Sequence, residues 1–203
     1  TVLDQLRQPL EEGVVRLSKA RLKTSFPAEI TLVAATNPCP CGWHGDRDHG
    51  CRCSINQRQR YWQKLSGPLL DRLDLQLRLE RRSASDIRGC LNPEMTSTKD
   101  SWLETGNICT ARQRMSERNP NGVPNRDLTA RGLGRHGLFE ASALQLWEQL
   151  VARRRLSTRS GIRLLRVART VADLNNSGHV DADAVAEAAG FRCADLMQVE
   201  NTV

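Results

Sequence analysis

The sequence predicts an α/β region followed by an all-α region within its 203 residues. Residues 29–37 are almost continuously apolar, which is typical of a strand buried on both faces of a parallel sheet. In residues 73–79 leucines alternate with polar residues, the pattern of a half-buried strand. Apolar residues then recur at helical spacing in 141–154 and 156–174, which predicts the all-α part.

The composition favours a soluble protein that meets polyanions. The formal net charge is +7 and the isoelectric point is near 9.4, as expected for a partner such as nucleic acid or a nucleotide phosphate; an ordinary solvated basic surface is the alternative. The sequence has no apolar run long enough for a membrane span or a signal peptide. Its seven cysteines suggest a metal site in a reducing compartment, so we expect a cytoplasmic location.

The first 26 residues predict a helix and then a hairpin. Leucines share one face of residues 1–12, and Gly13 is a natural stop. Two short alternating runs follow, joined by a tip of about three residues. The hairpin carries four cations that could contact a phosphate backbone, unless it is simply a solvated hairpin. These cations are Arg16, Lys19, Arg21 and Lys23.

Asn37 follows the first predicted strand directly. Ligand chemistry in parallel sheets gathers at the carboxyl ends of strands, so Asn37 is a candidate site residue. The alternative is that Asn37 only caps a turn before Pro38, a role that suits asparagine.

Four cysteines in two C-x-C pairs come next and predict a structural zinc site. Zinc prefers four soft ligands in a tetrahedron, and three glycines between the pairs allow the loop to fold back. Two alternatives remain: His44 or His49 could replace one thiol, or the thiols could be free and reduced. The predicted ligands are Cys39, Cys41, Cys51 and Cys53.

Arg72 is the third candidate site residue. A polar helix is predicted over residues 55–65, with Tyr61 and Trp62 as its bulky anchors, and a Ser-Gly-Pro turn follows. An exposed guanidinium after this turn could reach a phosphate on a neighbouring subunit. The alternative is a local ion pair with Asp71 or Asp74.

The remaining residues predict a connector and then helices. Residues 81–109 are poor in apolar residues and are interpreted as a connector with at most one short helix, followed by a basic helix over 110–119. In the helix over 156–174, Arg159, Arg163 and Arg166 fall on one stripe, which favours an anionic partner or else a solvated face. A last helix is predicted over 181–189.

Four segments resemble one known family. They are LDQLRQPLEEG, LVAATNPCPCG, RQRYWQKLSGPLLDRLDL and LSTRSGIRLLRVARTVADL. In this order they resemble the C-terminal part of the magnesium-chelatase-like AAA+ ATPases of the bacterial ComM/YifB group. The resemblance implies the second half of an AAA+ α/β core over residues 1–82, a linker over 83–109 and a helical lid over 110–203.

The resemblance also implies roles for the candidate residues. Asn37 corresponds to the sensor-1 asparagine, and Arg72 to the arginine finger that acts on the ATP of an adjacent subunit. Arg159 corresponds to the sensor-2 arginine of the lid, with Arg163 close enough to compete. The hairpin corresponds to one that touches DNA in related helicases. ATP, Mg²⁺ and a ring, expected to be a hexamer, are implied with them.

One departure from the family pattern limits the expected activity. The chain contains no G-x-x-x-x-G-K-[ST] phosphate loop and no apolar run ending in Asp-Glu to hold magnesium, so we expect it not to hydrolyse ATP by itself. As part of a complete protein it is expected to belong to an ATP-driven motor that remodels DNA, as in branch migration during DNA uptake. The alternatives are a magnesium-chelatase motor and a non-catalytic, zinc-stabilised nucleic-acid-binding module.

Overall fold

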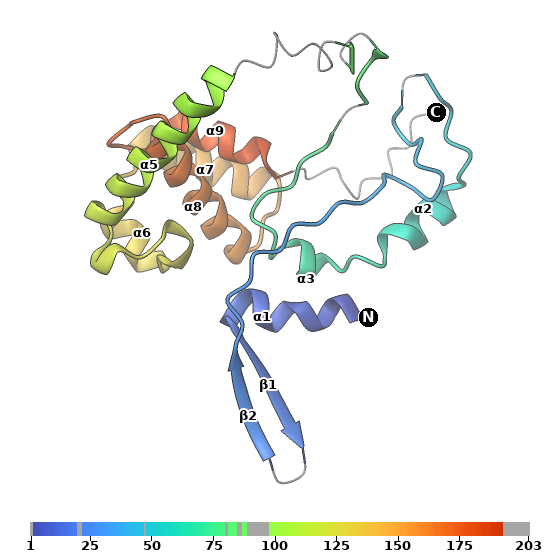
Figure 1. Cartoon of the computed structure of the whole chain (residues 1–203), viewed down its shortest axis with the longest axis horizontal. Coiled ribbons are helices and arrows are strands. Elements are labelled where there is room, and N and C mark those ends of the chain that lie inside the picture. Colours follow the sequence, from blue (N-terminus) through green and yellow to red (C-terminus); the bar gives the residue numbers. More distant parts are fainter. Residues whose placement is uncertain are drawn as a thin grey trace. The chain divides into compact units, whose positions relative to one another are not determined.

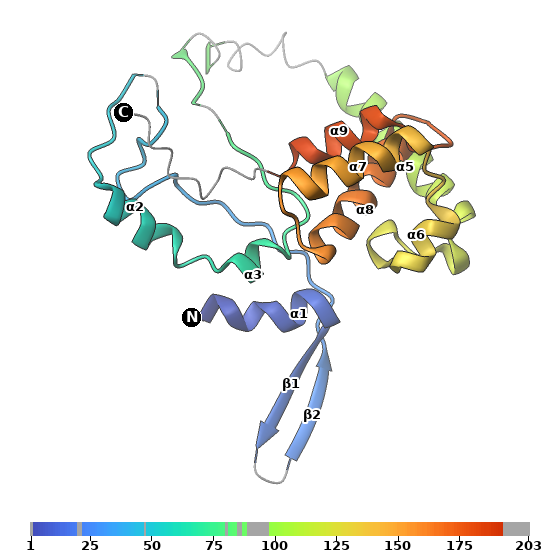
Figure 2. The ribbon, with the colours of Figure 1, turned by 180° about the vertical axis from the view of Figure 1, so that it is seen from behind.

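The computed structural model describes residues 2–19, 22–46, 48–79, 81–84, 87–88 and 98–192. The described residues form two compact units, one up to Gln76 and one from Leu77 onward. Figures 1 and 2 show the ribbon from opposite sides.

The first unit begins with a short 3-10 helix, η1 (Val2–Leu6), that continues as α1 (Arg7–Glu12). Gly13 ends α1 in the left-handed conformation, with φ of 64°, and its N–H donates to the carbonyl oxygen of Pro9 at 3.0 Å. Because only glycine adopts this conformation without steric cost, the predicted helix and its stop at Gly13 are confirmed.

A β-hairpin follows α1 and extends away from it (Figure 1). Strand β1 (Val14–Lys19) pairs antiparallel with β2 (Leu22–Pro27), with Arg16 opposite Ser25 and Ser18 opposite Lys23. The predicted hairpin is confirmed, and β1 runs through Lys19. Arg21 lies outside the described residues.

The segment after the cysteines forms two short helices, α2 (Ile55–Trp62) and α3 (Gly67–Leu70). Ser54 caps α2 through a reciprocal bond pair with Gln57, which is a capping box. Trp62 is buried, and its indole N–H donates to the carbonyl oxygen of Pro38 at 3.0 Å. The anchor role predicted for Trp62 is therefore confirmed, and it fixes α2 against the loop that carries the cysteines (Figure 2).

The two strands predicted for residues 29–37 and 73–79 are not formed as strands. Both segments run without regular secondary structure, with Val33 89% and Leu79 88% exposed. A strand needs a neighbour to satisfy its backbone N–H and C=O groups, and no strand pairs with either segment in the part of the chain that the structure describes. The apolar run and the alternating pattern therefore did not suffice to predict strands, because a strand also needs a pairing partner.

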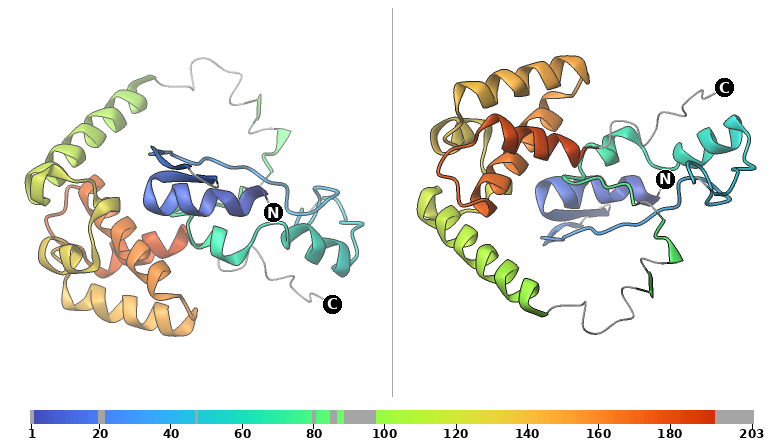
Figure 3. Two further views of the ribbon diagram at one scale, coloured as in Figure 1. Left: turned by 90° about the horizontal axis from the view of Figure 1, so that it is seen from below. Right: turned by 90° about the horizontal axis from the view of Figure 1, so that it is seen from above.

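The second unit is helical. It comprises α5 (Thr98–Arg118), η2 (Pro120–Gly122), η3 (Asn125–Asp127), α6 (Ala130–His136), α7 (Ala141–Arg153), α8 (Thr158–Leu174) and α9 (Ala182–Gly190). Figure 3 shows these helices from two sides, coloured from green to red. Together with the small sheet and helices of the first unit, they agree with an α/β region followed by an all-α region.

One boundary in the second unit was predicted wrongly. Residues 98–109 were expected to be connector, but they form the first half of α5. Their polar composition suggested a loop, yet no proline interrupts residues 98–119, and helix propensity is a weak prior that packing elsewhere along the same helix overrides.

Helix α8 contributes most to the core of this unit and contacts α5, α6, α7 and α9. Its N-terminus is capped by Ser157, whose hydroxyl accepts from the N–H of Ser160 at 3.1 Å. The indole N–H of Trp147 donates to Gly161 at 2.9 Å, which joins α7 to α8. Leu144 belongs to the apolar pattern that predicts α7, yet it is exposed.

None of the helices in the described part of the chain is long and apolar enough to cross a membrane.

Candidate metal centre and phosphate-contact residues

The four predicted metal ligands come together in the first unit. Their sulfur atoms all lie within 4.8 Å of one another. The Sγ atom of Cys39 lies 3.3 Å from that of Cys41 and 3.6 Å from that of Cys51. A tetrahedral site with Zn–S bonds of about 2.3 Å separates its sulfurs by about 3.8 Å, so the cluster is close to the size that zinc requires.

The loop between the cysteine pairs folds back at two glycines. Gly42 and Gly45 have φ of 82° and 81°, a backbone conformation that residues other than glycine rarely adopt. His49 stacks on Trp43 with ring centroids 4.2 Å apart, and its Nδ1 lies 3.3 Å from Asp46. The group of potential ligands consists of the four thiols, which favours this set over one that includes His49.

The pKa values of two of the thiols are shifted in opposite directions. The backbone N–H of Trp43, followed by that of Arg52, lowers the pKa of Cys41 to about 6. Burial raises the pKa of Cys53 to about 12, and the neighbouring thiols Cys41 and Cys39 add to this increase. These shifts favour the thiolate form of Cys41 and the thiol form of Cys53, and a bound cation would favour the thiolate form of both.

Asn37 is exposed just before this cluster. Its neighbours are tied to α2, because the Thr36 hydroxyl lies 3.0 Å from the Tyr61 hydroxyl and Pro38 accepts from Trp62. The backbone at Asn37 is thus held on both sides while its side chain faces solvent.

Arg72 is buried, with 9% of its surface exposed, so the prediction of an exposed arginine was wrong. Its guanidinium forms an ion pair with Glu11 of α1, and its Nε donates to the carbonyl oxygen of Arg7 at 3.1 Å. The sequence did not suggest this pair, since Glu11 precedes Arg72 by 61 positions. It leaves Arg72 well supplied with acceptors inside its own unit.

The arginine stripe predicted on α8 is not one uniform solvent face. Arg159 is exposed in the first turn, whereas Arg163 is buried. Arg166 donates from Nε and Nη2 to the carbonyl oxygen of Leu128, at 3.0 and 2.7 Å. Of the three arginines, Arg159 is thus the exposed one, whereas Arg163 is buried and Arg166 is partly buried.

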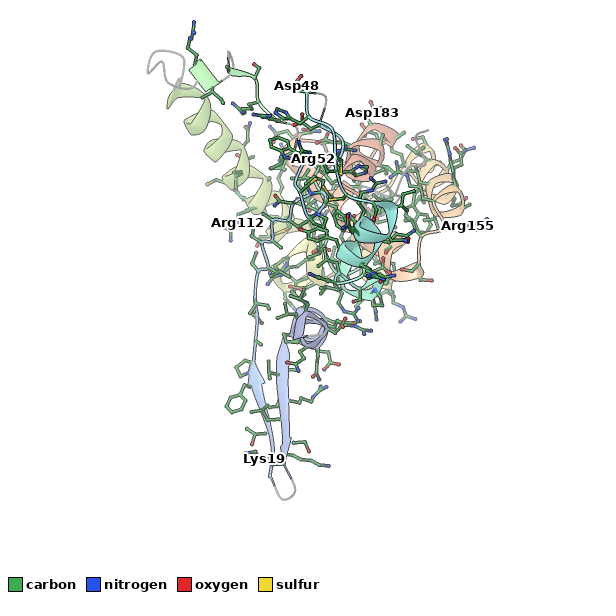
Figure 4. The ribbon with its side chains drawn as sticks, turned by 90° about the vertical axis from the view of Figure 1, so that its right-hand side faces the viewer. Lys19, Asp48, Arg52, Arg112, Arg155 and Asp183 are labelled. Carbon is green, nitrogen blue, oxygen red and sulfur yellow. The ribbon has the colours of Figure 1, made fainter. Side chains whose placement is uncertain are left out.

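The hairpin separates the two lysines predicted to contact nucleic acid. Residues paired across an antiparallel ladder share a face, and alternate residues point to opposite faces. Lys23 pairs with Ser18, whereas Lys19 pairs with Leu22, so the two lysines lie on opposite faces of the hairpin. Figure 4 shows Lys19 at the end of the hairpin.

Two family models match this chain. The model described as magnesium chelatase, subunit ChlI, matches residues 1–87, and the model of the C-terminal part of the same subunit matches residues 100–192. The chain belongs to the magnesium chelatase-like family.

Relatives in this family include YifB and ComM. The chain is 34% identical over 197 residues to YifB of Escherichia coli K12 and 35% identical over 191 residues to the competence protein ComM of Haemophilus influenzae Rd. These alignments cover 97% and 94% of the chain, but only 37% and 36% of the two relatives. The chain thus spans little more than a third of the length of the relatives that it matches.

The region matched by the second family model contains a buried polar network that the sequence analysis missed. Asp173 of α8 accepts from Arg169 at 3.0 Å and from Asn125 at 2.9 Å, and it forms an ion pair with Arg118 of α5. Arg169 is fully buried and also donates to the carbonyl oxygens of Gly137, Ser177 and Gly178. A signal was present: Arg169 and Asp173 are spaced i,i+4 on the apolar side of the helix.

Proposed function

We propose that this chain is part of an ATP-driven ring motor that acts on DNA. The observation that carries the proposal is the match of both magnesium chelatase models, in order, on a chain that is also similar to a competence protein. The net charge of +7 supports a polyanionic partner. In this proposal the phosphate loop and the residues that hold Mg²⁺ belong to the part of the protein corresponding to the remaining length of the relatives.

Within this motor, Asn37 orients the attacking water and the lid arginine contacts the nucleotide phosphates. The exposure of Arg159 in the first turn of α8, and the burial of Arg163, favour Arg159 for the lid contact. The end of the helix that carries Arg159 is also its positive end, which suits an anionic ligand.

Arg72 is proposed as the arginine finger of the neighbouring active site. An arginine finger raises the rate of phosphoryl transfer by several powers of ten, and to do so it must reach the phosphoryl group that is transferred. In this structure the guanidinium of Arg72 is instead paired with Glu11. The proposal therefore requires Arg72 to exchange the Glu11 carboxylate for a phosphate when subunits assemble. The chemistry is compatible with this exchange, because a guanidinium binds carboxylate and phosphate with the same bidentate geometry.

The cysteine cluster is proposed to hold one structural zinc ion through Cys39, Cys41, Cys51 and Cys53. The sulfur separations and the absence of other ligand types from the four-member group support zinc, and four thiolates leave no open position for substrate. The metal would fix the loop that precedes α2 and so hold the backbone beside Asn37.

The test is hydrolysis of ATP by the natural protein that contains this chain, measured with and without DNA. Hydrolysis stimulated by DNA supports the proposal. Because the matching family is described as magnesium chelatase, a second candidate function is a motor that drives magnesium insertion into a porphyrin. Hydrolysis that responds to a porphyrin and a chelatase partner but not to DNA would favour it. DNA binding without any hydrolysis would instead indicate a non-catalytic, zinc-stabilised nucleic-acid-binding module.

A further inference from the structure

The β1–β2 hairpin has two chemically different faces. The pairing places Arg16 opposite Ser25 and Ser18 opposite Lys23 on one face, and all four side chains are exposed. This set is called the polar face below. The other face carries Val15 opposite Phe26 and Leu17 opposite Thr24, with Leu17 58% and Phe26 49% exposed. Lys19 lies on this apolar face.

We infer that the polar face of the hairpin binds the phosphate backbone of nucleic acid, with Arg16 and Lys23 as the cations and Ser18 and Ser25 as hydroxyl donors. This inference rests on the proposed function and adds the surface that performs its DNA contact. Most contacts to a nucleic-acid backbone come from arginine, lysine and small hydroxyl side chains, the types that this face combines. The face is about two strands wide and lacks aromatic groups, so it reads charge and not bases.

The apolar face is unsuited to the same ligand. A phosphate placed over Leu17 and Phe26 would lose hydration without gaining donors, since Lys19, at the far end of the hairpin (Figure 4), is the one cation that the described pairing places on that face. Lys19 and Lys23 carry the same charge in strands that are directly paired, so the net charge of the chain does not distinguish them. Only the orientation of their side chains does.

Glu12 provides a second test of the inference, in which a substitution should raise the affinity instead of lowering it. Arg16 forms an ion pair with Glu12, and both side chains are well exposed, at 60% and 43%. An exposed pair of this kind contributes little to stability, so a phosphate can displace the carboxylate. Removing the Glu12 charge should therefore strengthen binding on the polar face.

The experiment measures fluorescence anisotropy of a labelled oligonucleotide of mixed sequence, single-stranded and duplex, titrated with the chain over a range of salt concentrations. Lys23→Gln and Arg16→Gln should each weaken binding roughly fivefold and reduce the salt slope by about one. Lys19→Gln, the matched control, should change affinity less than twofold. Glu12→Gln should tighten binding. Circular dichroism of each variant checks that the fold is kept.

Three results would overturn the inference, and they have different meanings. If Lys19→Gln weakens binding as much as Lys23→Gln, the assignment of faces is wrong although the hairpin binds DNA. If the wild-type chain binds but none of these variants changes affinity, the contact lies outside the hairpin. If the wild-type chain does not bind DNA even at low salt, the DNA part of the proposed function fails as well.

Discussion

Asp173 shows how one residue can organise the second unit. Its carboxylate is buried, at 2% exposure, and it faces two guanidinium groups, those of Arg118 and Arg169. Burial lowers the pKa of Arg169, while the charge of Asp173 opposes that shift, so the ion pair keeps the arginine charged inside the core. Its Nη1 and Nη2 groups also donate to the backbone carbonyls of Gly137, Gly178 and Ser177, whereas its buried Nε has no hydrogen-bond partner among the described residues.

Replacing Asp173 by Asn should therefore destabilise the second unit strongly. The change leaves the buried guanidinium of Arg169 and the partly buried one of Arg118 without their counter-charge, and removing one partner of a buried ion pair typically costs about 3 kcal/mol or more in the free energy of unfolding. Urea unfolding followed by circular dichroism measures it. Asp183→Asn is the matched control, because Asp183 is an exposed carboxylate near the start of α9 (Figure 4) and its loss should cost well under 1 kcal/mol. Equal effects of both substitutions would contradict the role given to Asp173.

The same residue scale explains why the arginines of α8 could not be sorted from the sequence. The three arginines share a helical stripe, so the sequence alone does not distinguish them. In the structure Arg159 is exposed, Arg163 is buried and Arg166 donates to a backbone carbonyl. The exposure and contacts of each arginine depend on the residues of η3 and the neighbouring helices that pack against α8. The spacing of arginines along α8 carries no information about those residues.

At the scale of elements, α6 ends in a corner that requires glycine. A Cβ atom on Gly137 would lie 2.1 Å from Phe139 and 2.5 Å from the carbonyl oxygen of Leu133. Phe139 in turn forms a β-bridge with Val180, so the corner joins the end of α6 to the segment before α9. The ring could move but the carbonyl belongs to the helix backbone.

Gly137→Ala should lower the free energy of unfolding by about 2 kcal/mol, the usual cost of forcing an extra carbon into a packed site. Gly134→Ala is a matched control in the same helix, since nothing lies within 4 Å of its added Cβ. That change should stabilise α6 by roughly 0.5–1 kcal/mol because alanine is the better helix former. Thermal unfolding of both variants gives the comparison, and a neutral Gly137→Ala would show that the corner can relax.

The cysteine loop is the second element with a testable requirement. The chain purified without chelator should contain about one zinc ion, and Cys39→Ser should lose most of it, because Cys39 is the fully buried member of the cluster. Cys109→Ser is the control, since Cys109 is a free, exposed cysteine on α5 and outside the cluster. Elemental analysis of the three proteins decides the matter. A well-folded wild-type chain without metal would refute the zinc site.

At the scale of the whole molecule, sequence reasoning succeeded where the signal is local. The hairpin, the grouping of the four cysteines, α2, α7 and α9 depend on caps, turns and spacing within a few residues, and these were predicted. It failed where the partner is distant. The Glu11–Arg72 pair joins residues far apart in the chain, and the apolar segments near Val33 and Leu79 need pairing strands that local alternation cannot supply.

The role of Arg72 can be decided in the natural protein that contains this chain. Arg72→Ala should abolish ATP hydrolysis while ATP binding, measured with a fluorescent analogue, stays nearly intact. Because Arg72 is buried against Glu11, loss of activity alone would not separate catalysis from stability. Glu11→Gln makes that separation. It breaks the same ion pair but keeps the guanidinium, so a finger predicts that Glu11→Gln retains hydrolysis, whereas a purely structural arginine predicts that both variants lose it together with their thermal stability.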